Sequence, residues 1–141
     1  MSRGVERIFL HSGGSSRVNR PNYECALFAE GGAPRKLFPA LAVFTGLMGA
    51  QPRFAGERRL GPSGYAMAFE TGTQCVIVLW LGDPDARGSA RLPSSDGAAW
   101  TDIMGRPIAP STARLSTSPV YLTGPAGKGK EWLASLQLTS P

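Results

Sequence analysis

Residues 74–81 (QCVIVLWL) carry the strongest strand signal of the chain, and they set the first condition on its fold. Every residue after Gln74 in this run is apolar, and turn sequences bound it, TGT before and GDPD after. A short, continuous apolar run of this kind is typical of a strand that is buried on both of its faces. The sequence therefore predicts a buried strand over residues 74–81.

Shorter candidate strands, separated by turns, surround this run. They cover residues 64–70, 89–93, 98–104 and 114–123. The 141 residues include 18 glycines and 12 prolines, a composition that favours many turns and a largely β chain. Short strands at this spacing indicate an antiparallel β-sandwich over residues 57–141. The pattern of the tail, residues 131–138, fits a last strand and a helical turn equally.

Residues 1–56 show a different pattern of one strand, one loop and one helix. Residues 5–10 (VERIFL) predict a buried strand, and the Gly/Ser-rich residues 11–16 predict a loop. Apolar side chains then share one helical face: Leu37, Phe38, Leu41, Phe44, Leu47 and Met48. One such unit cannot bury its own apolar faces. The isolated chain is therefore expected to self-associate through Leu37, Leu41, Phe44 and Met48.

Charge and hydropathy exclude two classes of partner. The net charge of +5, from 15 basic and 10 acidic residues, is spread along the chain, whereas a nucleic-acid footprint is clustered. We therefore expect no nucleic acid as a partner. No apolar run reaches the roughly 18 residues of a membrane span, so no membrane is expected. The N-terminus shows no signal peptide, which makes the cytoplasm the default location.

Residues 124–131 (GPAGKGKE) match the spacing of a phosphate-binding loop but not its chemistry. Glu131 stands where such a loop has a Ser or Thr for magnesium, and its carboxylate would repel phosphate. We therefore interpret the segment as a Gly-rich loop. His11 is the only histidine, so the sequence predicts no metal cluster and no cofactor. Cys75 is expected to be a buried thiol, and whether it pairs with Cys25 stays open.

The acidic and tryptophan side chains give no catalytic site. Hydrolysis of a glycosidic bond needs a pair of carboxylates, and no acidic pair here has a recognisable catalytic setting. Asp83 and Asp85 flank a proline and predict a turn. Trp80 is expected in the core, while Trp100 can face either way. Trp100 and Trp132 are the candidates for stacking on a sugar.

Several segments carry a family resemblance in the order in which they occur. Residues 7–11 (RIFLH) resemble the eighth strand of a (β/α)8 barrel, and residues 34–42 (PRKLFPALA) resemble its eighth helix. Residues 76–80 (VIVLW), 101–107 (TDIMGRP) and 118–124 (SPVYLTG) are similar to a central strand, a turn and a closing strand of the sandwich that follows. Together these segments resemble the C-terminal end of a clan A glycoside hydrolase, over roughly residues 5–124.

The resemblance implies that residues 1–56 are the end of a barrel and that residues 57–141 are a C-terminal β-sandwich. The acid/base and nucleophile glutamates of the family lie at the ends of the fourth and seventh barrel strands. Both are then expected before Met1, so this chain would contain no catalytic residue. The loop after the eighth strand would line the substrate cleft. The candidate substrate contacts are His11, Ser12, Asn22, Tyr23 and Trp100.

The expected function is the non-catalytic C-terminal portion of a glycoside hydrolase, which braces the barrel and contributes a loop to the substrate cleft. Its partner would be a carbohydrate substrate once it is joined to a barrel. Two alternatives remain: a free-standing sugar-binding sandwich that uses Trp100 or Trp132, and a protein that recruits a partner through the helix face. The motifs at residues 102–107 and 118–122 carry no chemistry, and they predict a turn and an edge of the sandwich.

Overall fold

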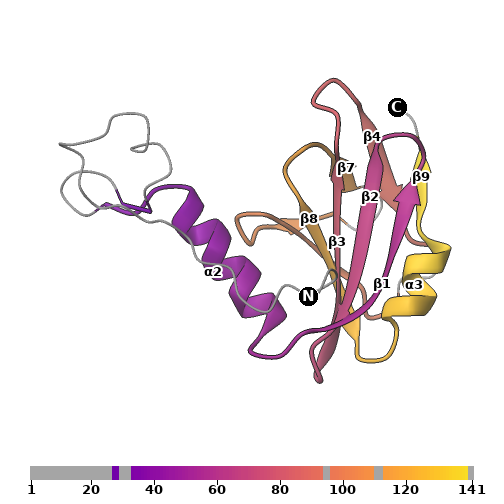
Figure 1. Cartoon of the computed structure of the whole chain (residues 1–141), viewed down its shortest axis with the longest axis horizontal. Coiled ribbons are helices and arrows are strands. Elements are labelled where there is room, and N and C mark those ends of the chain that lie inside the picture. The colour runs from indigo at the N-terminus through magenta and orange to yellow at the C-terminus, as the bar shows by residue number, and fades with distance from the viewer. Residues whose placement is uncertain (1–26, 29–32, 94–95, 110–112, 140–141) are drawn as a thin grey trace.

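The computed structural model describes residues 27–28, 33–93, 96–109 and 113–139, which form a mainly β structure with one helix before the strands (Figure 1). In chain order its elements are α2 (Leu37–Met48), β1 (Arg53–Leu60), β2 (Gly64–Glu70), β3 (Gln74–Leu81), β4 (Gly88–Arg91), β5 (Ala99–Asp102), β6 (Pro107–Ile108), β7 (Ala113–Leu115), β8 (Val120–Pro125), α3 (Gly129–Ser135) and β9 (Gln137–Thr139). This arrangement confirms the predicted fold class.

The strands form two antiparallel sheets that pack face to face. The larger sheet has the order β1-β2-β3-β8-β5-β6, and the smaller has the order β7-β4-β9. Side chains from the inner faces of both sheets build the main core, including Ile77, Leu79, Ala90, Trp100, Leu115 and Leu122. The burial of these apolar side chains between two layers is what stabilises a sandwich.

Strand β3 lies in the interior of the larger sheet, with β2 on one side and β8 on the other. Ile77 and Leu79 face inward and are fully buried, and Val76 on the outer face is fully buried as well. Further along the strand, the outward-facing Val78 and Trp80 are only half-buried. The predicted burial on both faces therefore holds for the first half of β3. In the second half, the outward-facing side chains are partly exposed to solvent.

Helix α3 closes one end of the inner face. Its Trp132 and Leu133 join the main core, and the ring of Trp132 lies against Gly124 of β8. A Cβ atom on Gly124 would lie 2.1 Å from this ring, so the packing requires glycine there. The Arg58 guanidinium of β1 donates hydrogen bonds to carbonyl oxygens at the C-terminal end of the helix, those of Leu133 (3.0 Å) and Ala134, and to that of Leu136 (2.9 Å), which follows the helix. These bonds satisfy acceptors that a helix C-terminus leaves open.

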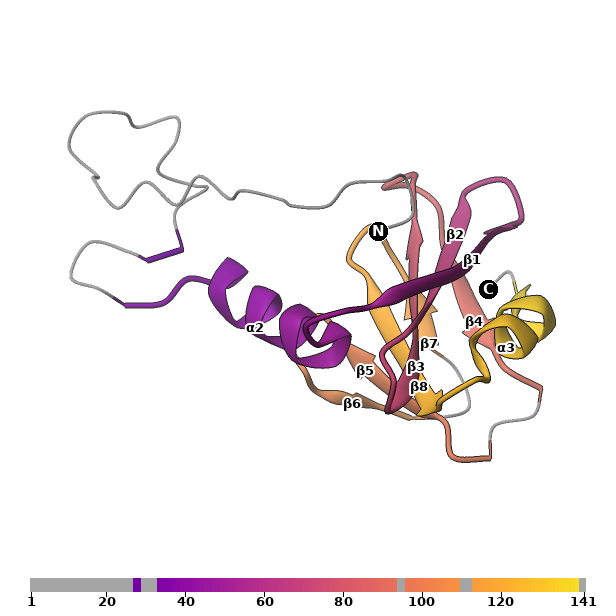
Figure 2. The same cartoon turned by 60° about the horizontal axis from the view of Figure 1, so that its bottom comes forward.

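Helix α2 packs on the outer face of the larger sheet through its second half only (Figure 2). Met48, Leu47, Phe44 and Val43 form a second apolar cluster with side chains from three strands, namely Phe69, Val76, Val78, Met67 and Tyr121. Gln74 Nε2 also donates a hydrogen bond of 3.1 Å to the carbonyl oxygen of Leu47. The first turn of the helix extends beyond the sheet, where Leu37 and Phe38 are each 41% exposed.

Three elements extend or correct the sequence predictions. Strand β1 was not predicted, and the expected boundary between residues 56 and 57 falls within it. The C-terminal tail contains both of the structures predicted for it, because helix α3 is followed by strand β9. Strand β8 was predicted at an edge of the sandwich, but it lies in the interior because β3 and β5 pair with its two sides.

Candidate functional site

The residues predicted to contact substrate fall into two groups. His11, Ser12, Asn22 and Tyr23 lie outside the described residues, as does the strand predicted over residues 5–10. Trp100 is 3% exposed, because its register on β5 turns its side chain into the main core. A ring covered in this way offers no face to a sugar, so the structure gives Trp100 a core role. Trp132 is 4% exposed and also belongs to the main core, so its ring offers no face to a sugar either.

The Gly-rich loop after β8 is held by a carboxylate from the protein itself. Glu70, at the end of β2, accepts hydrogen bonds from the backbone N–H groups of Gly127 (2.8 Å) and Gly129 (3.0 Å). These are the kind of donors that a phosphate-binding loop presents to its ligand. Because the Glu70 carboxylate already occupies them, the loop has no vacant donors there for a phosphate. Its role at this position is structural.

Cys75 lies beside this loop as a free thiol with no exposed surface. Burial raises the pKa of the Cys75 thiol above its ordinary value, and the nearby charge of Glu70 raises this pKa further. The thiol therefore stays protonated and unreactive at neutral pH, as expected for a core cysteine. Cys25, its predicted potential partner, lies outside the described residues.

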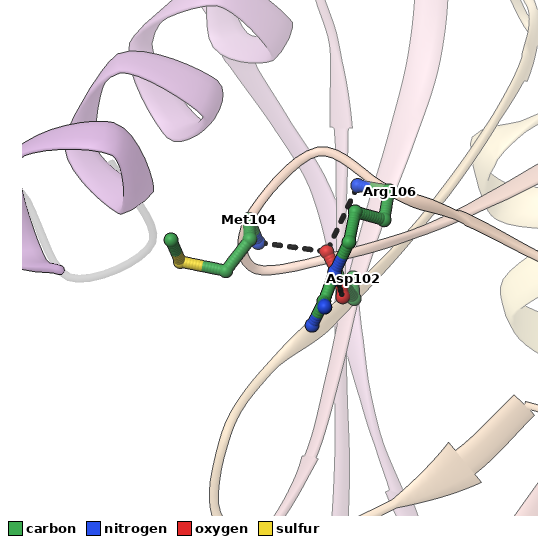
Figure 3. A network of polar contacts seen from close by, with 3 residues as sticks. All are labelled: Asp102, Met104 and Arg106. Carbon is green, nitrogen blue, oxygen red and sulfur yellow. Dashed lines mark hydrogen bonds and ion pairs between the residues drawn. The ribbon is translucent and has the colours of Figure 1, made fainter.

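The TDIMGRP motif forms a tight turn between β5 and β6, as predicted (Figure 3). Asp102 Oδ1 accepts from the backbone N–H groups of Met104 (2.8 Å) and Arg106 (2.9 Å), and Arg106 Nε donates to Asp102 Oδ2 (2.7 Å). Burial alone would raise the pKa of Asp102, but these bonds and the Arg106 charge outweigh it and lower the pKa. Gly105, with φ of 81°, supplies the left-handed residue that the turn needs.

Polar and aromatic side chains gather on the outer face of β1, β2 and β3, beside helix α2. The strand register aligns them in rows across the sheet. One row consists of Arg59, Tyr65 and Trp80, and the next consists of Glu57, Met67 and Val78. Side chains that lie opposite each other on one face of a sheet contact one another. On these rows large aromatic side chains and charged side chains share a half-open surface.

The first row is a ladder of stacked groups. The Tyr65 and Trp80 rings lie 5.2 Å apart between centroids with an angle of 7° between their planes. The Arg59 Cζ atom lies 3.9 Å from the centroid of the Tyr65 ring, a distance that allows a cation–π interaction. Arg59 Nη2 also donates a hydrogen bond of 2.7 Å to the carbonyl oxygen of Pro62. Arg59 therefore contacts both the Tyr65 ring and the backbone of the turn between β1 and β2.

A groove runs along this face, and we call it the outer groove. Its apolar part, of about 430 Å³, is lined by Phe44 and Met48 of α2 and by Met67, Phe69, Val78 and Trp80 of the strands. Its polar part, of about 440 Å³, is lined by Glu57, Arg59 and Tyr65, and it shares Met67 and Trp80 with the apolar part. The two volumes are within the range of ligand sites.

The far end of α2 presents a second apolar surface. Leu37 and Phe38 are exposed there, and the ring of Phe38 lies 5.0 Å from that of Phe28, which is 43% exposed. Of the four residues predicted to drive self-association, Met48 is 3% exposed and packs on the sheet, whereas Leu37 is available for contact. Clustered exposed apolar side chains are typical of interaction sites.

The described residues contain no group of three or more His, Cys, Asp or Glu side chains that could hold a metal ion. Within the same part of the chain, no helix has the length and apolar character that crossing a membrane requires. The outer face of β1, β2 and β3 presents aromatic rings, a thioether and an arginine. Comparisons of the chain with protein-family models, curated proteins and solved structures found no match.

A local signal in the sequence points to part of the outer groove. In residues 64–70, large side chains (Tyr65, Met67, Phe69) alternate with small ones (Ala66, Ala68), which indicates a strand with two different faces. The alignment of Tyr65 with Arg59 and Trp80 has no local signal, because it depends on which strands pair and in which register.

Proposed function

We propose that this chain is the non-catalytic C-terminal portion of a clan A glycoside hydrolase and that its sandwich braces the catalytic barrel. The observation that carries the proposal is helix α2, which packs on the sandwich through its second half and leaves Leu37 and Phe38 exposed on its first turn. A helix that joins two bodies has this distribution of contacts. In the resemblance, the same segment is the last helix of the barrel.

Four of the carboxylates in the described residues have structural partners, which supports a role outside the chemical step. Glu70 holds the backbone of the Gly-rich loop, Asp102 holds the turn after β5, and Asp83 accepts a hydrogen bond of 2.9 Å from the backbone N–H of Asp85. Glu131 pairs with Lys128 at 2.7 Å. Glycoside hydrolysis needs two carboxylates that face each other across a cleft. Under the proposal, those residues belong to the barrel.

The alternative of a partner-recruiting protein has support from the same exposed helix end. The alternative of a sugar-binding sandwich loses its two named residues, because Trp100 and Trp132 are buried. Titration of the chain with oligosaccharides should therefore show no binding. Saturable binding would favour the sugar-binding alternative over the bracing role.

The size of the native gene product tests the proposal directly. An antibody raised against residues 57–141 is used to blot extract from the source cells. Because a barrel adds on the order of 200 residues, a band of about 40 kDa or more is expected. A single band near 14.9 kDa, the mass of this chain, would overturn the proposal and favour the partner-recruiting alternative.

A further inference from the structure

We infer that two copies of this chain pair through α2, with the two helices antiparallel, so that the first turn of each helix lies in the outer groove of the other copy. Such a pair closes on itself, because each copy contributes one helix end and one groove. The pairing is a property of the 141-residue chain by itself and does not rest on the proposed function. In the proposed full protein, the barrel would cover the first turn of α2 instead.

Helix α2 carries no charged side chain, although only part of it is covered. Its sequence, LFPALAVFTGLM, contains one polar side chain, that of Thr45. The second half of the helix packs on the sheet, and the first turn projects beyond the strands in both views (Figures 1 and 2). A helix that is apolar on all sides is typical of a buried position. The uncovered part of α2 is therefore suited to contact with another apolar surface.

One stripe of large side chains runs along α2 on the side that borders the groove. Phe44 and Met48 line the groove, and Leu37 and Leu41 continue the same helical face towards the first turn. The intervals between these four residues are four, three and four, so the stripe has the same spacing in both directions. In an antiparallel pair, Leu37 of one copy therefore lies opposite Met48 of the other, and Leu41 lies opposite Phe44.

The outer groove has the room and the charge balance for this helix end. Its apolar part, of about 430 Å³, has Met67 and Trp80 on the strand side. In its polar part, Glu57 and Arg59 lie on the same face of β1, so their charges balance. A neutral rim fits the uncharged first turn of α2, where Leu37 is 41% exposed. The groove and the helix end are thus two apolar surfaces of one chain that can cover each other.

Charges at the two ends of α2 favour the antiparallel direction. The exposed Lys36 stands at the N-cap position, beside the positive end of the helix dipole. Within α2, all of which the structure describes, the last turn has no basic residue at its negative end. The register that places Leu37 opposite Met48 brings Lys36 of each copy beside the C-terminal end of the other helix. Each copy thereby supplies the cation that the other helix lacks there.

Sedimentation of the 141-residue chain over a range of concentrations tests the size of the assembly. The mass should rise from 14.9 kDa to twice that value and no further. A chain that stays monomeric at every concentration overturns the inference. A species that keeps growing past the dimer does so too, because it would show an open head-to-tail contact in place of a closed pair.

Two neighbouring substitutions on α2 locate the contact. Thr45→Arg places a charged side chain at an exposed position that lines the groove, and it should weaken dimerisation at least about tenfold. The matched control is Gly46→Arg, on the side of the helix away from the stripe, where nothing lies within 4 Å of a Cβ atom. It should leave dimerisation unchanged. Equal effects of the two substitutions would contradict a contact along the groove side of α2.

Hydroxyl-radical labelling read by mass spectrometry identifies the surface that receives the first turn. Labelling of Met67 and Trp80 should fall as the chain dimerises, and it should stay constant at all concentrations in the Leu37→Ser variant. Trp100 and Trp132, both buried, should stay unlabelled throughout, which shows that the chains remain folded. If Leu37→Ser abolishes the dimer while Met67 and Trp80 label equally in monomer and dimer, the two first turns contact each other and the inference is wrong.

Discussion

At the scale of single residues, two carboxylates determine the conformation of two loops. The Glu70 carboxylate accepts hydrogen bonds from the backbone N–H groups of Gly127 and Gly129, where a phosphate-binding loop would bind its ligand. The Asp102 carboxylate accepts hydrogen bonds from the backbone N–H groups of Met104 and Arg106 in one turn. In both cases a charged acceptor satisfies backbone donors that the chain reversal leaves without a partner. Hydrogen bonds to a charged group are stronger than those between neutral groups.

Replacement of Glu70 should therefore be costly. Glu70→Ala leaves the N–H of the buried Gly129 without its acceptor, so the free energy of unfolding should fall by about 1–3 kcal/mol. Guanidinium denaturation measures this as a lower midpoint with an unchanged slope. The control is Glu131→Ala, which removes only an exposed pair with Lys128 and should cost less than about 1 kcal/mol. Equal effects of the two substitutions would show that Glu70 does not hold the loop.

The lowered pKa of Asp102 gives a prediction about pH. A carboxylate whose pKa is lower in the folded state contributes stability above its unfolded pKa of about 3.9, and the contribution is lost as the pH falls through the folded value. At pH 7, Asp102→Asn should unfold more easily than the unsubstituted chain by about 1 kcal/mol. Below about pH 3.9 the gap should close progressively. Thermal melts at pH 7 and pH 3 measure the difference in stability between Asp102→Asn and the unsubstituted chain. A difference that does not change with pH would contradict the lowered pKa of Asp102.

At the scale of elements, the contact between β1 and α3 joins the sheet edge to the end of the chain. Arg58 Nη1 binds carbonyl oxygens at the C-terminal end of α3, which places a positive charge at the negative end of the helix. The seven-residue helix is too short to be stable alone, so it depends on this contact and on the burial of Trp132.

Loss of that contact should loosen α3 first. Arg58→Met keeps the aliphatic stem and removes the hydrogen bonds, and it should lower stability by about 1–2 kcal/mol. Hydrogen exchange should accelerate in residues 129–136 more than in β3. Arg59→Met, the neighbouring substitution on the outer face, should leave exchange in α3 unchanged. An equal acceleration of hydrogen exchange in α3 in both variants would contradict this role of Arg58.

The strands that sequence predicts best are those with the clearest local pattern. Residues 64–70 and 74–81 have the bounds of β2 and β3, because side-chain alternation and a continuous apolar run are local features. Strand β1 has three arginines among its eight residues, and only its pairing with β2 makes it a strand. The outer groove was missed for the same reason, since pairing brings Arg59, Tyr65 and Trp80 into one row.

At the scale of the whole molecule, the exposed end of α2 distinguishes the isolated chain from the proposed full protein. The second half of the helix is packed and the first turn is not, so the isolated chain should self-associate through Leu37 and Phe38. Sedimentation and the fluorescence of an apolar dye should detect association at high concentration. A monomer with no dye binding would contradict this expectation.

Substitution separates that association from folding. Leu37→Ser together with Phe38→Ser should abolish self-association and leave the unfolding midpoint almost unchanged, because both side chains are 41% exposed. Met48→Ser provides the contrast, since Met48 is buried between α2 and the sheet. It should cost about 2–5 kcal/mol, the usual range for emptying an apolar core site. Association that survives the double substitution would place the contact elsewhere.

The interior position of β8 also determines when the chain can fold during its synthesis. Strand β8 fills the place between β3 and β5, although both leave the ribosome before it. Until residue 125 has emerged, β3 keeps an unpaired edge with the sequence QCVIVLWL, a composition prone to intermolecular strand pairing. Non-local pairing of this kind makes folding slow. While residues 82–125 are emerging from the ribosome, the nascent chain therefore exposes this edge, and protection by a chaperone is expected to matter at that stage.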